Sequence, residues 1–334
     1  MIEARDILRL MPRGKWMSAM DLAAGVKLEM SVLDRRIRSL VDDGVAIGCC
    51  RQRGYRLEQA IDFIDQDCLA AQLARASELD PRRGEVLDQV DSTSTRLLNW
   101  SNSDDIHGRV CVSEFQSAGR GRHGRRWHGA RYRNVMLSLA WLWTGQPAGA
   151  AGVSLSIGVA VGRVLSQLTS ASIQLKWPND ILADEGKLAG ILVDVMPPAN
   201  GPMRVVIGLG VNVNNPPELD HKVDQRVSNL CDSAIGPVSR TRLAGNLVLA
   251  LAGVLDRFAL SGFTADYVQW NALDAFRDKP VMAVINGVTV NGKGRGVNQD
   301  GSYAIIDQHG HLYSATAGEV QLMRYPQTNS TGCA

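Results

Sequence analysis

The residues best suited to chemistry lie in a short segment that alternates glycine and arginine. Between Gly119 and Asn134 the chain has six arginines and two histidines and no acidic residue. Glycines at 119, 121 and 124 let the backbone come close to a ligand. Guanidinium groups bind phosphate, carboxylate or nucleic acid. The segment therefore predicts either an anion-binding loop or a nucleic-acid contact.

The spacing Gly119-x-Gly121-x-x-Gly124 also fits the dinucleotide-binding fingerprint. That motif needs a helix after the glycines and an acid about twenty residues later for the ribose. The residues after Gly124 have no helical period, and no Asp or Glu occurs between Glu114 and Asp180. A Gly-x4-Gly-Lys-Ser/Thr segment is also missing from the sequence, so we expect neither a Rossmann site nor a P-loop.

Three later segments place polar residues at the ends of predicted elements. They are Lys176-Trp-Pro-Asn-Asp180, Lys187-Leu-Ala-Gly-Ile-Leu192 and Gly208-Leu-Gly-Val-Asn212. Either lysine alone is typical of a solvated surface group, and the Asn212 amide alone is a weak signal of ligand binding. Only their combination indicates a site.

The first elements that must position these residues form a small N-terminal unit. Residues 2–11 and 31–42 read as helices, Ser18-x-x-Asp21 as the cap of a helix between them, and 45–57 as a hairpin. This order predicts a winged helix-turn-helix over residues 1–62. Arg35, Arg36 and Arg38 lie mostly off the apolar face of the third helix. They indicate either a solvated face or DNA binding.

The rest of the chain predicts an α+β fold. A helical linker is expected at 63–85 and a catalytic unit at 86–274, with strands near 110–115, 135–143, 173–177, 190–195 and 205–211 and helices near 153–168 and 240–260. Strands outnumber helices and occur in runs, which favours a mixed sheet with helices over alternating α/β. Glycine turns between 280 and 323 predict a small β-barrel at 275–326.

The composition of the chain limits the cellular compartments in which we expect the protein. The chain has 334 residues, a net charge of only +2, and six cysteines with no metal-ligand spacing. We expect reduced cysteines, no structural zinc and no signal peptide, which favours a cytoplasmic protein. The longest apolar stretch, 148–168, is interrupted by polar residues and predicts a buried helix, not a membrane span.

In their order, these landmarks resemble the biotin–protein ligase family. The resemblance rests on Asp91-Ser-Thr93, Gln116-x-x-Gly-Arg-Gly-Arg122, Trp127 and the segments with Lys176, Lys187 and Asn212. With its N-terminal unit, the chain is similar to bacterial enzymes that are both biotin ligase and biotin operon repressor. The resemblance covers almost the whole chain, and it implies a class II synthetase-like catalytic sheet and an SH3-like terminal barrel.

The resemblance also implies a reaction. Biotin and ATP would form biotinyl-5′-AMP, and biotin would then pass to a lysine of the biotin carboxyl carrier protein of acetyl-CoA carboxylase. Mg²⁺ would be carried mainly by ATP, with no protein metal site. Operator DNA and a ligand-promoted homodimer are the other partners that it implies.

The family's functional positions carry over to this sequence. Biotin would contact Ser92, Thr93, Ser94, Gln116, Arg120, Gly121, Arg122 and Lys187. The nucleotide would contact Trp127, Lys176, Asn179 and Asn212. Two anions meet in the first step, so Arg120, Arg122 and Lys187 would act as positioned cations. Asp180 would orient or deprotonate the acceptor lysine, or cap a turn.

Two departures and two alternatives accompany this interpretation. Ser94 stands where the family usually has asparagine, and Glu29 puts a negative charge where DNA phosphates would lie. The alternatives are a lipoate or octanoate ligase on the same scaffold and a non-enzymatic repressor that senses a small ligand. The Gly-Arg-Gly-Arg string followed by Trp127 favours biotin.

Overall fold

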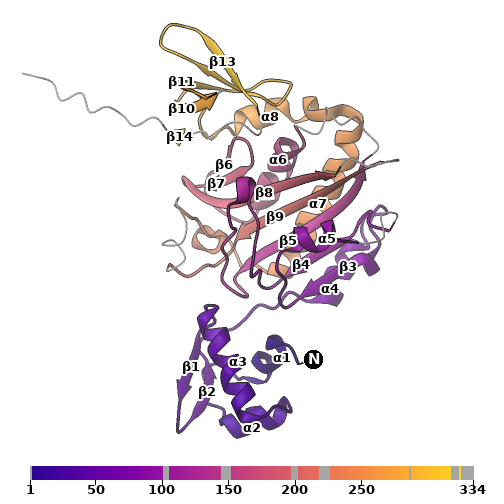
Figure 1. Ribbon diagram of the computed structural model, residues 1–334, viewed down its shortest axis with the longest axis vertical. Helices are drawn as coiled ribbons and strands as arrows, with labels where there is room; N and C mark the ends of the chain where they lie inside the picture. Colours follow the sequence, from indigo (N-terminus) through magenta and orange to yellow (C-terminus); the bar gives the residue numbers. More distant parts are fainter. Residues whose placement is uncertain are drawn as a thin grey trace, which may run out of the picture.

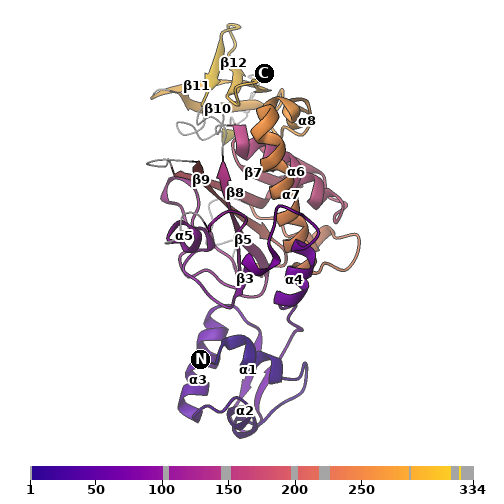
Figure 2. The ribbon, with the colours of Figure 1, turned by 90° about the vertical axis from the view of Figure 1, so that its right-hand side faces the viewer.

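Three parts follow one another along the long axis of the molecule (Figures 1 and 2). The computed structural model describes residues 2–100, 105–143, 152–196, 202–217, 226–285, 287–316 and the backbone of 323–324. A helical unit lies at one end, a large sheet with helices in the middle, and a small sheet at the other end.

The N-terminal part consists of three helices and a hairpin. Its elements are α1 (Ala4–Leu10), α2 (Ala19–Gly25), α3 (Met30–Asp42), β1 (Ile47–Cys50) and β2 (Gly54–Leu57). Ser18 caps α2 by accepting a hydrogen bond from the Asp21 backbone amide at 3.0 Å, as the spacing predicts. Leu33, Ile37 and Leu40 of α3 are buried in a hydrophobic cluster of this part. The expected helices and hairpin are therefore present.

The linker contains one helix and ends in a short turn. Asp65 caps α4 (Gln66–Leu73), whose Leu69 and Leu73 pack into the core of the middle part. Residues 81–83 form only a short 3-10 turn that begins with Pro81, and β3 (Gly84–Leu87) already belongs to the sheet. The first strand of the sheet thus spans residue 86, where we expect the catalytic unit to begin.

The central sheet has seven strands in the order β3-β4-β5-β9-β8-β7-β6. Its other strands are β4 (Val110–Ser113), β5 (Asn134–Trp143), β6 (Ile173–Lys176), β7 (Asp180–Ala183), β8 (Gly186–Met196) and β9 (Met203–Asn212). The pairing of β3 with β4 is parallel and all others are antiparallel, so the sheet is mixed. The middle strands β5 and β9 are buried along nearly their whole length, as in a sheet covered on both faces.

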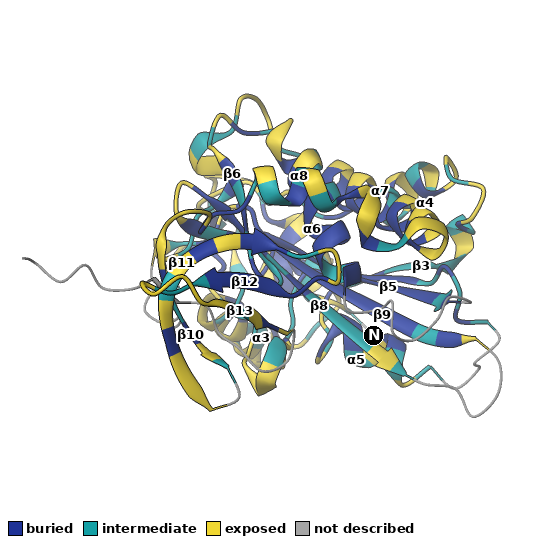
Figure 3. Cartoon of the chain, turned by 90° about the horizontal axis from the view of Figure 1, so that it is seen from above, coloured by how far each residue is buried: buried dark blue, intermediate teal, exposed yellow. Residues whose placement is uncertain are grey.

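Helices α6 (Val153–Ser166) and α7 (Arg240–Ser261) cover one face of this sheet together with α4. The short α5 (Thr93–Leu98) packs on the other face, and α8 (Tyr267–Ala272) follows α7 (Figure 3). Among the described residues, 240–265 is the one helical stretch long and apolar enough to cross a membrane, but more than half of its apolar window is buried in the protein. It is a core helix, and so is α6, as the sequence predicts.

The C-terminal part is a five-stranded antiparallel sheet in the order β13-β12-β11-β10-β14. Its strands are β10 (Pro280–Ile285), β11 (Val288–Val297), β12 (Tyr303–Ile306), β13 (Leu312–Ala315) and β14 (Met323–Arg324). Buried contacts join it to the middle part: Trp177 donates to the Gly301 carbonyl at 3.0 Å, and Tyr303 donates to Asp274 at 2.8 Å. Residues 286, 317–322 and 325–326 of the predicted 275–326 unit lie outside the described residues.

Candidate active site

A cavity of about 630 Å³ opens between the arginine–glycine loop and the strands β8 and β9. Leu137 of β5 and parts of five segments line it, namely 92–94, 116–128, 176–180, 187–192 and 208–210. The predicted catalytic, biotin-binding and nucleotide-binding residues all line this cavity except Asn212. The fold thus brings together landmarks that are far apart in the sequence.

One wall of the cavity is built from hydroxyl groups at the start of α5. Ser92, Thr93 and Ser94 are each less than 5% exposed. Thr93 donates from its backbone amide to Oε1 of Gln116 at 2.7 Å, and its hydroxyl lies 2.8 Å from that of Ser138 on β5. The hydroxyl of Ser94 lies 3.0 Å from the same Ser138 oxygen. This wall offers several fixed donors and acceptors to a polar, uncharged ligand group.

The floor is formed by strand glycines with Trp127 lying against them. A Cβ on Gly210 would stand 2.5 Å from the indole ring, and one on Gly190 would stand 3.2 Å from it. The indole therefore occupies space that any other residue at 210 would fill. Within the described part of the chain, its buried Nε1 has no hydrogen-bond partner.

The charged groups gather around Lys187. Its ammonium lies 2.8 Å from a carboxylate oxygen of Asp180 and 5.7 Å from the centre of the Trp127 ring. Arg122 donates to Asn179 at 3.4 Å. Burial lowers the pKa of Arg122, while Asp180 opposes that shift. Two cations and one carboxylate thus stand in a partly desolvated site, where electrostatic interactions are strong.

The arginine–glycine loop folds back on itself as a narrow hairpin. Gly121 donates to the Arg125 carbonyl at 2.8 Å, and Trp127 donates to the Gly119 carbonyl at 3.0 Å. Its tip has left-handed backbone at His123 and at Gly124, with φ of 54° and 73°. No helix of a dinucleotide-binding fold follows in the described residues 125–134, in agreement with the sequence.

Arg120 lies at the outer edge of this loop. Its guanidinium makes two hydrogen bonds to Asp194 on β8, at 3.1 and 3.2 Å, and its side chain is 39% exposed. The ion pair therefore attaches the loop to the sheet. Arg122 and Lys187 instead contact Asn179 and Asp180.

Comparison with known proteins identifies this arrangement. Residues 86–212 match the Biotin/lipoate A/B protein ligase family. The chain is 31% identical to the bifunctional ligase/repressor BirA of Salmonella typhimurium over 95% of this chain and 96% of that protein. The chain belongs to the biotin protein ligase family. The family and enzyme class predicted from the landmarks are thereby confirmed.

Two further biotin protein ligases extend the comparison. The chain is 35% identical to the biotin–[acetyl-CoA-carboxylase] ligase of Mycobacterium tuberculosis, over 73% of this chain and 90% of that protein. A biotin protein ligase from Aquifex aeolicus, solved in complex with biotin and ATP, superposes with a TM-score of 0.62 at 24% identity and covers 72% of this chain and 99% of its own. This likeness supports the predicted α+β, class II synthetase-like fold.

Two predicted site residues of this biotin protein ligase have other partners. Asn212 is 4% exposed and donates its side-chain amide to the Lys187 backbone carbonyl at 3.0 Å, so it lies behind the cavity. Arg36 on α3 donates to the Ile2 carbonyl, whereas Arg35 and Arg38 are exposed. The N-terminal arginines lie in a part of the molecule remote from the cavity (Figure 1).

Sequence reasoning missed two residues that support the biotin protein ligase site. Ser138 lies in an apolar strand and joins the hydroxyls of Thr93 and Ser94. A small polar residue inside the apolar run of 135–143 was the available signal. Asp194 gave no such signal, because its partner Arg120 is distant in sequence.

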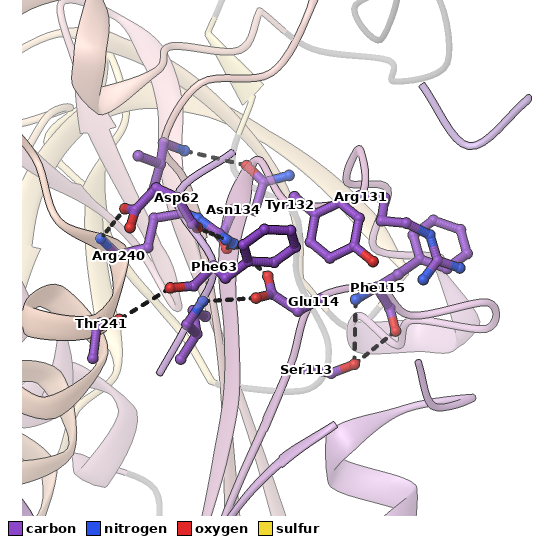
Figure 4. A network of polar contacts seen from close by, with 12 residues as sticks. Asp62, Phe63, Ser113, Glu114, Phe115, Arg131, Tyr132, Asn134, Arg240 and Thr241 are labelled. Carbon is purple, nitrogen blue, oxygen red and sulfur yellow. Dashed lines mark hydrogen bonds and ion pairs between the residues drawn. The ribbon is translucent and has the colours of Figure 1, made fainter. Parts of the chain in front are cut away.

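A buried polar network joins the central sheet to the linker from the N-terminal part (Figure 4). Glu114, which is 1% exposed, accepts from Arg240 at 2.8 Å and from the backbone amide of Ile64 at 2.7 Å. Burial raises the pKa of Glu114, and the nearby Arg240 opposes this shift. The backbone amide of Arg240 also donates to the Asp62 carboxylate at 2.7 Å. Glu114 directly follows β4 and stands two residues before Gln116, so this network holds the cavity wall.

Proposed function

We propose that this chain joins biotin to ATP and then transfers biotin to a lysine of a biotin carboxyl carrier protein. In the first step a carboxylate oxygen of biotin attacks the α-phosphorus of ATP and pyrophosphate leaves. In the second step the lysine amine attacks the acyl carbon, AMP leaves and the amine loses a proton. The charge cluster of Lys187, Asp180 and Arg122 beside a wall of hydroxyls carries this proposal.

Each part of the cavity suits one part of the reactants. Ser92, Thr93, Ser94 and Gln116 would hold the polar biotin ring, with Ser94 and Ser138 in place of the usual asparagine contact. Lys187, Arg122 and Gly121 would face the reacting carboxylate and α-phosphate, with Arg120 at the edge of the loop. Attraction to positioned cations lowers the cost of bringing two anions together.

The nucleotide would lie toward Trp127, Lys176 and Asn179. Asp180 is the one acid among the residues that line the described cavity, and the described residues hold no cluster of three metal-binding side chains. Such a lining fits Mg²⁺ that arrives on the triphosphate, since Mg²⁺ commonly uses one or two carboxylates together with substrate phosphates. Asn179 and Asp180 are the oxygen donors that would face it, and the metal would neutralise phosphate charge.

Besides facing the metal, Asp180 has two further roles in this proposal. It pairs with Lys187, and it would also orient or deprotonate the acceptor lysine, whose solution pKa is about 10.4. We expect Asp180→Asn to slow transfer from preformed biotinyl-5′-AMP by about 100-fold or more, as for a lost general base. Single-turnover transfer and biotin-dependent pyrophosphate exchange separate the two steps. An unchanged transfer rate would leave Asp180 with the ion pair alone.

A transfer assay tests the proposed function directly. The purified chain, ATP, Mg²⁺ and a carrier domain with its target lysine should give a product that streptavidin detects on a blot. Lys187→Met should abolish the signal, and a carrier domain without its lysine should stay unlabelled. Lipoate or octanoate in place of biotin distinguishes the ligase alternative. DNA binding with no transfer to a competent acceptor would instead indicate a non-enzymatic ligand sensor.

We also propose that residues 1–62 are a winged helix-turn-helix that binds operator DNA and makes the enzyme a repressor. The exposed Arg35 and Arg38 on α3 would contact DNA, while Arg36 would hold the helix to the N-terminal residues. Fluorescence anisotropy with duplexes selected from a random pool tests this. Arg35→Ala and Arg38→Ala should each weaken binding and lower the salt slope by about one if they contact phosphate.

The remaining units and partners complete the proposal. Residues 63–85 would be the linker, 86–274 the catalytic unit and 275–326 an SH3-like unit. Biotinyl-5′-AMP would promote a homodimer, and sedimentation with and without biotin and ATP tests this. A monomer under both conditions would contradict it. The five described cysteines are all free thiols, which suits the reducing cytoplasm where we propose that the protein acts.

A further inference from the structure

The contact between Asn212 and Lys187 is the visible end of a longer chain of buried amides. Asn212 accepts from the side chain of Asn215 at 3.0 Å, and Asn215 accepts from that of Asn134 at 2.6 Å. The three side chains are at most 6% exposed. Asn134 begins β5 and pairs in register with Asn212 at the end of β9. The chain of amides therefore crosses two strands and ends on a third, β8.

Backbone groups at both ends fix the direction of every amide in this chain. The Val213 amide donates to Oδ1 of Asn134 at 3.2 Å, and the Ala130 amide donates to Oδ1 of Asn215 at 3.2 Å. Their oxygens must therefore accept there, and their nitrogens must point onward. At the far end the Lys187 carbonyl can only accept, so Nδ2 of Asn212 must donate to it.

This direction leaves no room for a carboxylate at position 215. Aspartate has nearly the shape of asparagine, but its ionised form only accepts hydrogen bonds. It would face the oxygen of Asn212 instead of donating to it. Asn212 could then satisfy it only by turning its amide, and the turned amide would present an oxygen to the Lys187 carbonyl.

The row of three amides ends on the backbone carbonyl of Lys187. On its outer side this residue is held by residues 226–228, since its amide donates to the Arg226 carbonyl at 2.8 Å and its carbonyl accepts from Ser228 at 3.1 Å. Asn212 supplies the bond from the inner side. The pairing of β7 with β8 shifts register beside Lys187, so strand pairing alone does not fix it. The Lys187 ammonium lies 2.8 Å from Asp180. A small shift of the Lys187 backbone would therefore move the ammonium relative to Asp180.

If the three amides only stabilised the fold, they would not need to be hydrogen-bonded polar groups. Replacing both partners of a buried hydrogen bond by apolar groups of similar shape can be nearly neutral for stability. Three oriented amides that end on one carbonyl specify a position in addition to filling space. We propose that Asn215 is a positioning residue, which acts through Asn212 to hold Lys187 where it meets the reacting carboxylate and α-phosphate. This inference rests on the proposed ligase function.

The variant Asn215→Asp tests the inference, with Asn271→Asp as its matched control. Asn271 also bridges backbone groups, donating to the Val297 carbonyl and accepting from the Val297 amide, but it lies beside the C-terminal sheet. Both variants should lose stability. Only Asn215→Asp should lower kcat/KM for biotin-dependent pyrophosphate exchange, by about 10- to 100-fold, as expected for a misplaced reacting group. Biotin binding without ATP should change less than threefold, because the hydroxyl wall is separate from the amide chain.

A second measurement does not depend on enzyme activity. Acylation of Lys187 by an amine-reactive ester, followed by mass spectrometry, reports its environment relative to the exposed Lys279. Lys187 should be acylated faster in Asn215→Asp than in the parent. Its acylation rate should be unchanged in Asn271→Asp. If the parent lacks ligase activity but this shift is found, the proposed function fails and the positioning role stands. If Asn215→Asp does not fold, Asn215→Ala takes its place, because it removes the donor to Asn212 without adding a charge. A folded variant with parental kcat/KM and parental Lys187 reactivity overturns the inference.

Discussion

The guanidinium of Arg131 lies 2.8 Å from the carboxylate of Asp43, at the C-terminal end of α3. The same side chain lies 3.3 Å from Asp88 and over the ring of Phe115 at 4.5 Å, and it is only 3% exposed. Asp88 shortly precedes the Ser92–Ser94 wall in the sequence, and Phe115 directly precedes Gln116. One buried arginine therefore joins the N-terminal part to both segments that shape the hydroxyl wall of the cavity.

Arg131→Met should destabilise the protein, because it removes the buried cation shared by Asp43 and Asp88 and leaves Asp88 with only Arg5, at 4.0 Å. Removing one member of a buried ion pair costs about 3–5 kcal/mol. Urea unfolding should show a lower midpoint, and limited proteolysis should cut more quickly near residues 58–65. Arg82→Met removes a side chain that is 90% exposed from its pair with Asp80 and should give no measurable change. Equal midpoints for the two variants would contradict the role of Arg131.

Gly210→Ala should displace Trp127, because the new Cβ would stand 2.5 Å from the indole. Loss of an aromatic contact worth about 1.4 kcal/mol corresponds to a tenfold change in binding. We expect KM for ATP to rise by about tenfold in pyrophosphate exchange. Gly253→Ala on the exposed side of α7 has open space around its Cβ and should instead raise stability by about 0.5–1 kcal/mol. An unchanged KM for ATP in Gly210→Ala would show that Trp127 does not serve the nucleotide.

The half-buried His107 should make stability depend on pH. Its Nδ1 accepts from the Leu142 amide at 3.2 Å, which requires the neutral ring. Burial lowers the pKa of His107 below its usual 6.5, with Asp256 opposing and Arg83 assisting the shift. The unfolded chain therefore takes up the proton first. The stability from the neutral ring is present above pH 6.5 and is lost as the pH falls through the folded-state pKa.

The variant His107→Asn measures this contribution, since asparagine can accept the same hydrogen bond without titrating. The free energy of unfolding should fall less steeply for the variant than for the parent between pH 6.5 and pH 5. Urea titrations at several pH values give the comparison. Parallel curves over that range would rule out the histidine as the cause.

Asp194→Asn should loosen the arginine–glycine loop, because Arg120 loses its charged partner on β8. The loop holds arginines at 120, 122, 125 and 126, so trypsin reports its exposure. We expect faster cleavage within 119–127 and little change in global stability, since the pair is partly exposed. Biotin and ATP together should slow cleavage in both proteins. Identical cleavage rates for parent and variant would show that Asp194 does not hold the loop in place.

The sequence was sufficient for the long elements and for most of the cavity lining. Strongly apolar runs such as 135–143 predict strands, and the Lys176–Asp180 and Lys187–Leu192 segments mark one site. Short elements were missed for a physical reason. The four residues of β7 carry too little periodicity, and α5 begins with three small hydroxyl residues that also suit a loop.

The orientation of single side chains could not be read from the sequence. Arg36 lies off the buried face of α3 by periodicity, yet the Ile2 carbonyl captures it. Asn212 stands at the end of a strand beside the glycines of the cavity, but its side-chain amide donates to the backbone carbonyl of Lys187 behind the cavity. Both outcomes depend on partners that only the folded chain brings near.

The amide chain has a consequence for how the enzyme is made. Lys187 is synthesised before Asn212 and Asn215, and its inner hydrogen bond forms only after β9 has paired with both β5 and β8. A ribosome-bound fragment that ends after β8 would carry the arginine–glycine loop and Lys187 without the group that fixes the lysine. Reactive biotinyl-adenylate would then be formed only by chains whose sheet is complete, and unfinished chains would not release it.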